Sequence, residues 1–200
     1  MRAAMRCLAG ALVIACASWP AAGDAAPHTR TGFCAGVGFG MESVSWTDED
    51  GDRAFEESGS TNARVGWAIK PDLVLGVEFW GWGKDYEIST HTAPVPVDVK
   101  LAATTLCVTY YPGNGGFFAR LGAGYAYGRI SVEPPSSVTD VPAVSEKKSG
   151  LAVDIAPGYE WRLSERFALG AQGDIVYLGI GEPLENAFGY GLSAQFNWYW

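Results

Sequence analysis

Apolar and polar positions alternate strictly over the last residues of the chain. From Phe188 to Trp200, apolar and aromatic side chains occupy one phase of the alternation, while small or polar residues and Tyr199 occupy the other. A period of two residues is the period of a β-strand. A strand with one apolar and one small or polar face fits a barrel wall, with lipid outside and a polar lumen inside.

Eight segments have this strand character, and each is long enough for the ~9 to 11 residues that cross a bilayer at a tilt. They are Gly32 to Trp46, Thr61 to Ile69, Leu73 to Tyr86, Val97 to Tyr111, Phe117 to Val132, Gly150 to Trp161, Phe167 to Tyr177 and Ala187 to Trp200. Beyond the first residues the chain has no apolar run of the ~18 residues that a membrane helix needs, so a spanning structure has to be a closed barrel. We therefore predict an all-β fold, an eight-stranded antiparallel up-and-down transmembrane β-barrel.

The connections between these segments alternate in length. The long ones are Thr47 to Ser60, Glu87 to Pro96, Glu133 to Ser149 and Leu178 to Asn186. The short ones are Lys70 to Asp72, Pro112 to Gly116 and Ser164 to Arg166. Long loops on one side and tight turns on the other are typical of outer-membrane barrels. The long loop that ends in Ser149 is rich in proline and serine and is expected to be mobile.

The phase of the alternation assigns charged side chains to the lumen, because an ion facing lipid is costly. The inward candidates are Glu42, Arg64, Glu78, Lys84, Asp98, Lys100, Arg120, Asp154, Glu160 and Asp174. In the fourth segment the apolar phase changes, and we expect a β-bulge between Ala102 and Thr105. An eight-stranded barrel is only wide enough for its own side chains, so we predict a lumen network of Arg64, Glu78, Arg120, Asp154, Glu160 and Asp174.

The short turns predict which of these residues face each other. About the turn centred on Pro71, Arg64 and Glu78 come out opposite and are expected to form a salt bridge. About the turn at Ser164, Asp154 and Asp174 come out opposite, and two such carboxylates need a cation, for which Arg120 is the candidate. A paired-carboxylate site is the functional alternative to a satisfied network.

Aromatic side chains fill the upper lumen in this assignment. Trp80 and Trp82 point inward, opposite glycines of the first and last strands: Gly36, Gly38, Gly40, Gly189 and Gly191. Bulky residues against small ones pack a tapered barrel. An aromatic pocket for a small apolar ligand is the alternative.

The first residues predict export. Arg2 and Arg6, then an apolar run from Cys7 to Ala17 and small residues up to Gly23, are typical of a cleaved signal peptide over residues 1–23. The barrel domain then covers residues 24–200. Cleavage removes two arginines and no acidic residue, so the formal charge falls from -8 to -10, which argues against nucleic-acid binding. The alternative is a lipidated Cys16 in a lipobox-like sequence.

Two cysteines and one acidic loop carry little further chemistry. Cys34 and Cys107 lie on the first and fourth strands, too far apart for a disulfide, so we predict free thiols. The loop with Asp48, Asp50 and Asp52 has the spacing of a calcium loop. However, it has Arg53 in place of the turn glycine. It is interpreted as a solvated acidic loop, with loose divalent binding as the alternative, and no metal or other cofactor is predicted.

The terminal strand and the eight-segment pattern resemble the small outer-membrane β-barrels of the OmpA-like and outer-membrane β-barrel domain families. The resemblance implies a bacterial outer-membrane location and makes Phe196, Trp198 and Trp200 the signal that the barrel-assembly machinery binds. It also implies contact with outer-membrane lipid and lipopolysaccharide, and a monomer. Because the chain stops at the last strand, no periplasmic peptidoglycan-binding domain is expected.

A structural, surface-interaction or membrane-stabilising protein without enzymatic activity is the leading interpretation. The enzyme alternative is a lipid A-modifying barrel, for which Glu87, Ser89 and His91 cluster in one loop, but the His-x-Ser arrangement of the deacylases is replaced by His91-Thr92-Ala93. The transport alternative, a narrow channel or a carrier of small apolar molecules, needs a wide lumen or a lateral opening.

Overall fold

The computed structural model describes residues 30–47, 53–89, 93–132, 143–181 and 184–200. The strands are β1 (Gly32–Thr47), β2 (Arg53–Lys70), β3 (Leu73–Ser89), β4 (Pro94–Tyr110), β5 (Phe117–Val132), β6 (Val144–Arg162), β7 (Phe167–Gly179) and β8 (Glu185–Tyr199), with a 3-10 turn η1 (Pro112–Asn114) after β4. No helix in the described ranges is long and apolar enough to cross a membrane.

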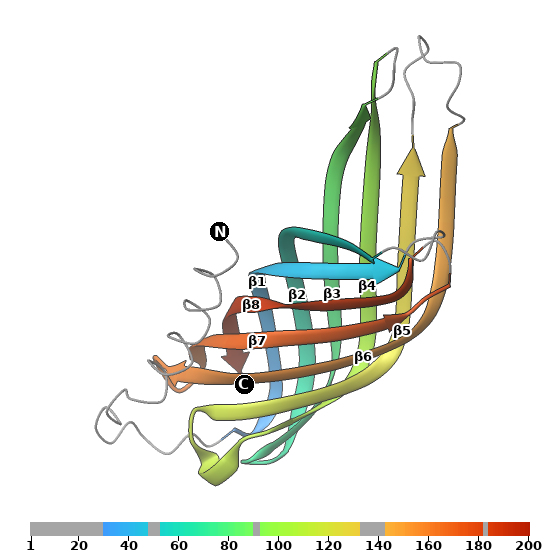
Figure 1. Cartoon of the computed structure of the whole chain (residues 1–200). Coiled ribbons are helices and arrows are strands. Elements are labelled where there is room, and N and C mark those ends of the chain that lie inside the picture. Colours follow the sequence, from blue (N-terminus) through green and yellow to red (C-terminus); the bar gives the residue numbers. More distant parts are fainter. Residues whose placement is uncertain (1–29, 48–52, 90–92, 133–142, 182–183) are drawn as a thin grey trace.

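All eight strands pair with their sequence neighbours in antiparallel fashion, and β1 pairs with β8 to close the ring (Figure 1). The predicted fold class is therefore confirmed, with the predicted number and order of strands. In such a ring every strand has two partners, which is what a sheet in lipid requires.

Four strands begin earlier than predicted, and the difference is largest for β2 and β6. β2 starts at Arg53, so residues 53–60 belong to the wall and not to a loop. β6 starts at Val144, so the end of the expected mobile loop is also strand. The predicted calcium-like positions, Asp48 to Asp52, lie outside the described residues.

The bulge predicted between Ala102 and Thr105 is wrong. β4 keeps one continuous register against both neighbours, from Pro94 to Tyr110 on one side and from Val97 to Tyr110 on the other. Its side chains also alternate without interruption between exposed and buried. Consequently Asp98 and Lys100 point outward, contrary to the prediction, while Val99 and Leu101 are buried inside.

The outward face of the barrel is apolar over a continuous belt. Leu106 is 73% exposed, Met41 66% and Leu121 59%, values that a water-soluble surface rarely shows over a large area. On β5 the belt runs from Phe117 to Tyr127. Ten residue steps at ~3.4 Å and a tilt of ~40° give a height of about 25 Å, the thickness of the apolar band of outer-membrane barrels.

Four strands continue beyond this belt as an open sheet, seen rising above the other strands in Figure 1. We call it the outer sheet: residues 83–89 of β3, 94–100 of β4, 129–132 of β5 and 144–150 of β6. Among the described residues, its two outermost strands, from β3 and β6, pair on one side only. The outer sheet lies at the end of the barrel that carries the long loops.

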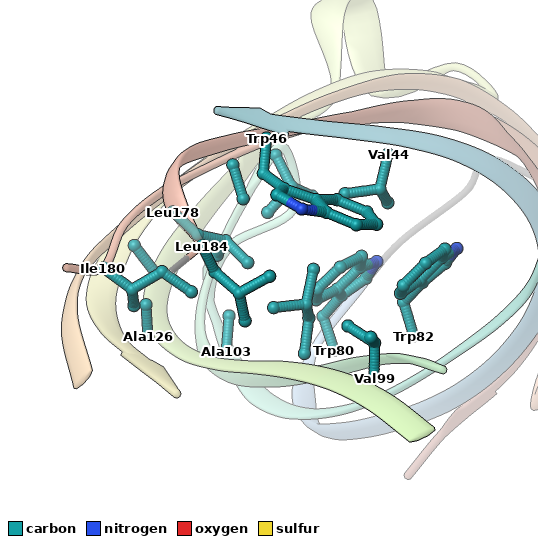
Figure 2. Packing of buried hydrophobic residues seen from close by; sticks show 14 of the residues in the cluster. Val44, Trp46, Trp80, Trp82, Val99, Ala103, Ala126, Leu178, Ile180 and Leu184 are labelled. Atoms are coloured by element: carbon teal, nitrogen blue, oxygen red, sulfur yellow. The ribbon is translucent and has the colours of Figure 1, made fainter. Parts of the chain in front are cut away.

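An apolar cluster fills the lumen at the same end, beneath the outer sheet (Figure 2). Trp46, Trp80 and Trp82 form its centre, and the Trp46 and Trp82 rings meet edge to face at 6.3 Å between centroids. Leu178, Ile180 and Leu184 close it from the β7–β8 side.

The terminal strand supplies the first testable prediction. Phe196→Ala, Trp198→Ala and Trp200→Ala together, with Tyr199 kept, should remove the protein from the outer-membrane fraction, because these outward residues of β8 are the predicted assembly signal. The measurement is the mobility shift between unboiled and boiled samples of that fraction.

The matched control changes three aromatic residues of the same belt on other strands, Phe117→Ala, Tyr159→Ala and Trp161→Ala. This variant should still assemble. If both variants are lost equally, the aromatic residues stabilise the barrel generally and β8 carries no special signal.

Candidate functional site

Arg120 on β5 lies at mid-height in the lumen among three carboxylates from three other strands. Its Nε lies 2.5 Å from Glu78 Oε2 and 3.7 Å from Asp154 Oδ2, and one terminal nitrogen lies 3.7 Å from Asp174 Oδ1. All four residues are buried. Buried charges of this kind are stable only when paired.

Neutral polar side chains complete this layer. Gln172 accepts a hydrogen bond from Arg120 at 3.2 Å and donates one to Asp174 at 2.5 Å. Ser193 donates to the other Asp174 oxygen at 2.5 Å and accepts from Gln195 at 3.0 Å. Arg120 on β5 thus contacts residues of β3, β6 and β7, and Asp174 extends the network to Ser193 on β8.

Two of the predicted pairings fail although the residues lie in the lumen. Arg64 and Glu78 are register partners, as predicted, but Glu78 pairs with Arg120, and Arg64 donates to the Asn197 side chain at 2.7 Å. Asp154 lies opposite Val176 and not Asp174, because the β6–β7 pairing is centred on Glu165, one residue beyond the predicted centre.

Glycine makes room for this layer on the barrel wall. A Cβ at Gly122 would overlap the Asp154 carboxylate and lie 2.7 Å from the Thr105 hydroxyl. A Cβ at Gly38 would overlap the Gln195 and Asn62 side chains. Gly122 is the register partner of Asp154, and Gly38 is the partner of both Asn62 and Gln195. Long polar side chains can therefore lie over the neighbouring strand, because the adjacent position in the same row has no side chain.

Glu42 links the polar layer to the apolar cluster above it. Its two carboxylate oxygens accept hydrogen bonds from Trp80 Nε1 at 2.9 and 3.1 Å, and its backbone carbonyl accepts one from Trp82 Nε1 at 3.3 Å. The predicted inward Lys84 lies higher, at the rim, where its Nζ is 3.5 Å from Glu56.

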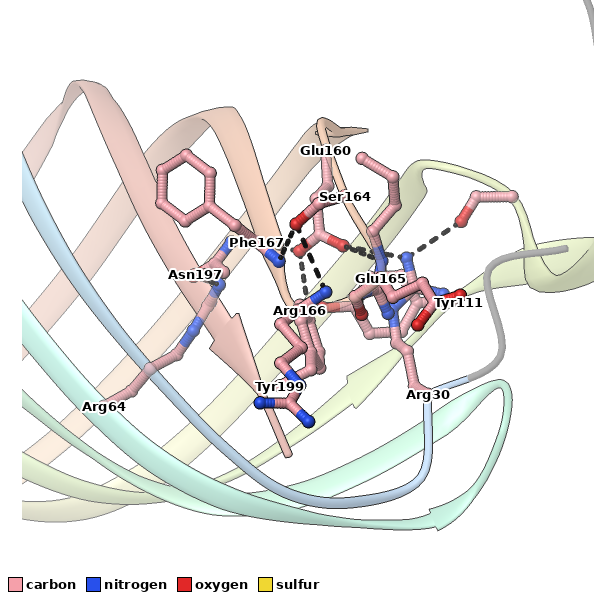
Figure 3. A network of polar contacts seen from close by, with 12 residues as sticks. Arg30, Arg64, Tyr111, Glu160, Ser164, Glu165, Arg166, Phe167, Asn197 and Tyr199 are labelled. Carbon is pink, nitrogen blue, oxygen red and sulfur yellow. Dashed lines mark hydrogen bonds and ion pairs between the residues drawn. The ribbon is translucent and has the colours of Figure 1, made fainter. Parts of the chain in front are cut away.

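A third layer occupies the end with the short turns (Figure 3). Glu160 is fully buried and accepts from Arg30 at 3.1 Å, from Asn197 at 2.9 Å and from Tyr199 at 2.5 Å. The Arg30 guanidinium stacks over the Tyr111 ring at 3.3 Å. Arg30 precedes β1 and Tyr199 ends β8, so this layer joins both ends of the described chain inside the lumen.

The predicted lumen network did not include three residues of this layer, Arg30, Tyr111 and Tyr199. Arg30 precedes the first predicted segment, where period-two alternation assigns no face. Tyr111 ends the fourth predicted segment, in the phase opposite to Tyr110, but its contact with Arg30 depends on a residue far away in the chain. Tyr199 offered a signal, since it is the one large aromatic residue in the small and polar phase of the last strand.

The cavities beside the network are small. One, bordered by Arg64, Asn197 and Tyr199, has a volume of about 20 Å³. Another, between Trp80, Arg120 and Asp174, has about 10 Å³. Each holds about one water molecule.

The cysteines and the possible metal ligands were the other candidates for chemistry in the sequence. Cys34 and Cys107 are free, as predicted, and lie in one register row with Gly66 and Gly76 between them. Among the described residues no group of three or more His, Cys, Asp or Glu side chains is arranged to hold a metal ion. His28, His91 and Cys16, like the whole predicted signal peptide, lie outside the described residues.

The fold matches solved outer-membrane proteins. One of them is Ail, the attachment invasion locus protein of Yersinia pestis, whose structure was solved in complex with the heparin analogue sucrose octasulfate. It superposes with a TM-score of 0.63 and 12% sequence identity, and the match covers 84% of this chain and 99% of Ail. Neisserial surface protein A superposes with a TM-score of 0.57 and 16% sequence identity. The match covers 85% of this chain and 98% of that protein. This is the fold of the small outer-membrane β-barrels. No family model and no curated protein matches the sequence.

The Arg120 layer gives a second prediction. Arg120→Met should destabilise the barrel by about 3 to 5 kcal/mol, because it leaves buried carboxylates without their cation. The measurement is urea unfolding of the barrel refolded in detergent, followed by tryptophan fluorescence.

Arg64→Met is the matched control, since it removes the same group from the same lumen but breaks a hydrogen bond to a neutral amide. We expect a loss of about 1 to 3 kcal/mol. Adding Glu78→Gln and Asp174→Asn to Arg120→Met should recover stability. A loss that is equal for the two arginines would contradict the assignment of Arg120 as the central cation.

Proposed function

We propose that this protein is a closed, non-conducting outer-membrane barrel that carries the outer sheet and the long loops on the cell surface, in a surface-interaction or membrane-stabilising role. The observation that carries the proposal is the filling of the lumen by three successive layers of side chains. These are the apolar cluster, the Arg120 layer and the Glu160 layer. A pore through eight strands would need all three of these cross-sections to be open.

The orientation follows from the loop lengths. Outer-membrane barrels have short periplasmic turns and longer extracellular loops. By this rule the outer sheet faces the cell exterior and the Glu160 layer faces the periplasm. A rigid barrel that holds a sheet and loops above a membrane is suited to interaction, because loops on a fixed scaffold can vary without affecting its stability.

The same barrel in a protein named for attachment and invasion supports a surface role. We extend the proposal to the absence of catalysis, since the filled lumen offers no cleft for a lipid acyl chain. Mass spectrometry of lipid A from cells with and without the protein tests this extension. An added or missing acyl chain would favour the enzyme alternative.

Conductance tests the closed barrel. The wild-type protein in planar bilayers should give no discrete current steps at either polarity. Removing one layer, by Arg120→Ala with Gln172→Ala or by Trp80→Ala with Trp82→Ala, should also give none, because the other layers remain.

Combining these substitutions with Glu160→Ala and Tyr199→Ala should open a current, which is the positive control for insertion. Each variant is first checked for the mobility shift of a folded barrel. Reproducible steps from the wild-type protein would overturn the proposal and favour the channel alternative.

A further inference from the structure

We propose that Lys100, Arg129 and Lys147 form a binding site for the phosphate groups of the outer-leaflet glycolipid, on the outward face of the barrel at the base of the outer sheet. In the β4–β5 ladder Lys100 is the partner of Arg129, and in the β5–β6 ladder Arg129 is the partner of Lys147. Three cations from three strands therefore stand side by side in one register row. This inference rests on the orientation proposed above.

The row has a defined height relative to the lipid belt. Tyr127, two residues before Arg129 on the same face of β5, ends the belt, and Tyr125 below it is 57% exposed. Two residues along a tilted strand correspond to a rise of about 5 Å. Aromatic side chains mark the boundary of the hydrocarbon region, so the cations lie at the level of the headgroup phosphates.

The side chains of the row are available to a ligand from outside. The Lys100 side chain is 62% exposed and Lys147 is exposed. Arg129 Nε donates to the Ser131 hydroxyl at 3.0 Å, which holds the guanidinium against the outward face. Lys100, Arg129 and Ser131 border one side of an open hollow of about 270 Å³, and Asp85 and Asp98 line its other side. A phosphate group would therefore bind at the Lys100–Arg129 side of the hollow.

Acidic neighbours lie to one side of the row. On the outward face these are Asp85 and Glu87 on β3 and Asp98 on β4, with Asp98 Oδ2 2.9 Å from Lys100 Nζ. Slight burial raises the pKa of Asp98, but the hydrogen bonds from Lys100 and Asp85 and the positive charges of Lys100 and Arg129 lower it below its ordinary value overall. Asp98 is thus paired with Lys100, whereas no ion pair is found for Arg129 and Lys147 among the described residues, so the positive charge of the row is concentrated on the β5–β6 side.

Phosphate on a lipid fits these observations better than a soluble anion does. The row lies on the lipid-facing side of the wall, directly above the apolar belt, and not in the lumen or among the loops. A ligand that extends its acyl chains along the belt and its phosphates to the row contacts both surfaces at once. In the bacterial outer leaflet such a ligand is the phosphorylated glycolipid lipid A.

Energy transfer from the barrel's tryptophans to dansyl-labelled lipid A in phosphatidylcholine vesicles tests the site. Wild-type protein should enrich bis-phosphorylated lipid A around itself. Lys100→Ala with Lys147→Ala should weaken this apparent affinity about 10- to 30-fold, since each cation near a charged lipid surface contributes about a factor of five. Arg129→Ala should weaken it further.

The matched control, Lys70→Ala with Arg166→Ala, removes the same charge from exposed positions at the opposite end and should bind as wild type. All variants are first shown to be folded by the mobility shift on gels. Equal binding by the Lys100/Lys147 variant and the wild-type protein would overturn the proposal, as would equal enrichment of dephosphorylated lipid A or of phosphatidylglycerol. Full competition by millimolar inorganic phosphate would overturn the lipid source in favour of a free anion. None of these results affects the conductance test, so the two proposals fail independently.

Discussion

Eight strands enclose a lumen no wider than the side chains that point into it, and every inward charge has to find its partner among the other inward side chains. This constraint explains why one arginine meets carboxylates from three strands and why Glu160 takes its donors from both ends of the described chain. It also explains the glycines, since a long inward side chain on one strand requires an empty position beside it on the neighbouring strand. The strands are thus joined twice, by their backbone ladders and by side chains across the lumen.

The alternation of inward and outward side chains continues past the edge of the apolar belt, but the face that carries the apolar residues changes there. Below Tyr127 the outward residues are mainly apolar and the charged residues of the network point inward, whereas in the outer sheet the valines of β4 point inward and Asp98 and Lys100 point outward. β4 contains both arrangements in one continuous strand: Leu106 faces lipid, while Val99 is buried in the apolar cluster. The same strand therefore has the pattern of a membrane barrel in its lower part and of a water-soluble sheet in its upper part.

This change of environment explains what the sequence could and could not predict. The number and order of the strands follow from local alternation and turn lengths, and the Arg64–Glu78 register follows from a tight turn. The bulge in β4 was wrong because a change of surroundings was interpreted as a change of backbone phase. The Arg64 ion pair was wrong because a long side chain can reach along the lumen to another strand. The roles of Arg30, Tyr111 and Tyr199 depend on contacts across the lumen, which no local pattern encodes.

The closing pair of strands has a consequence for the time at which the barrel can form. Cys34 pairs with Tyr199 and Thr47 with Glu185, residues that are 165 and 138 positions apart in the chain. The edge of β1 therefore has no partner until the last residues of the chain are available. Until then the unpaired backbone and the exposed apolar belt are open to aggregation, because an unprotected strand edge readily pairs with another chain. A barrel closed by its first and last strands can therefore form only when the whole chain is available, and its unpaired edges have to be kept away from other chains until then.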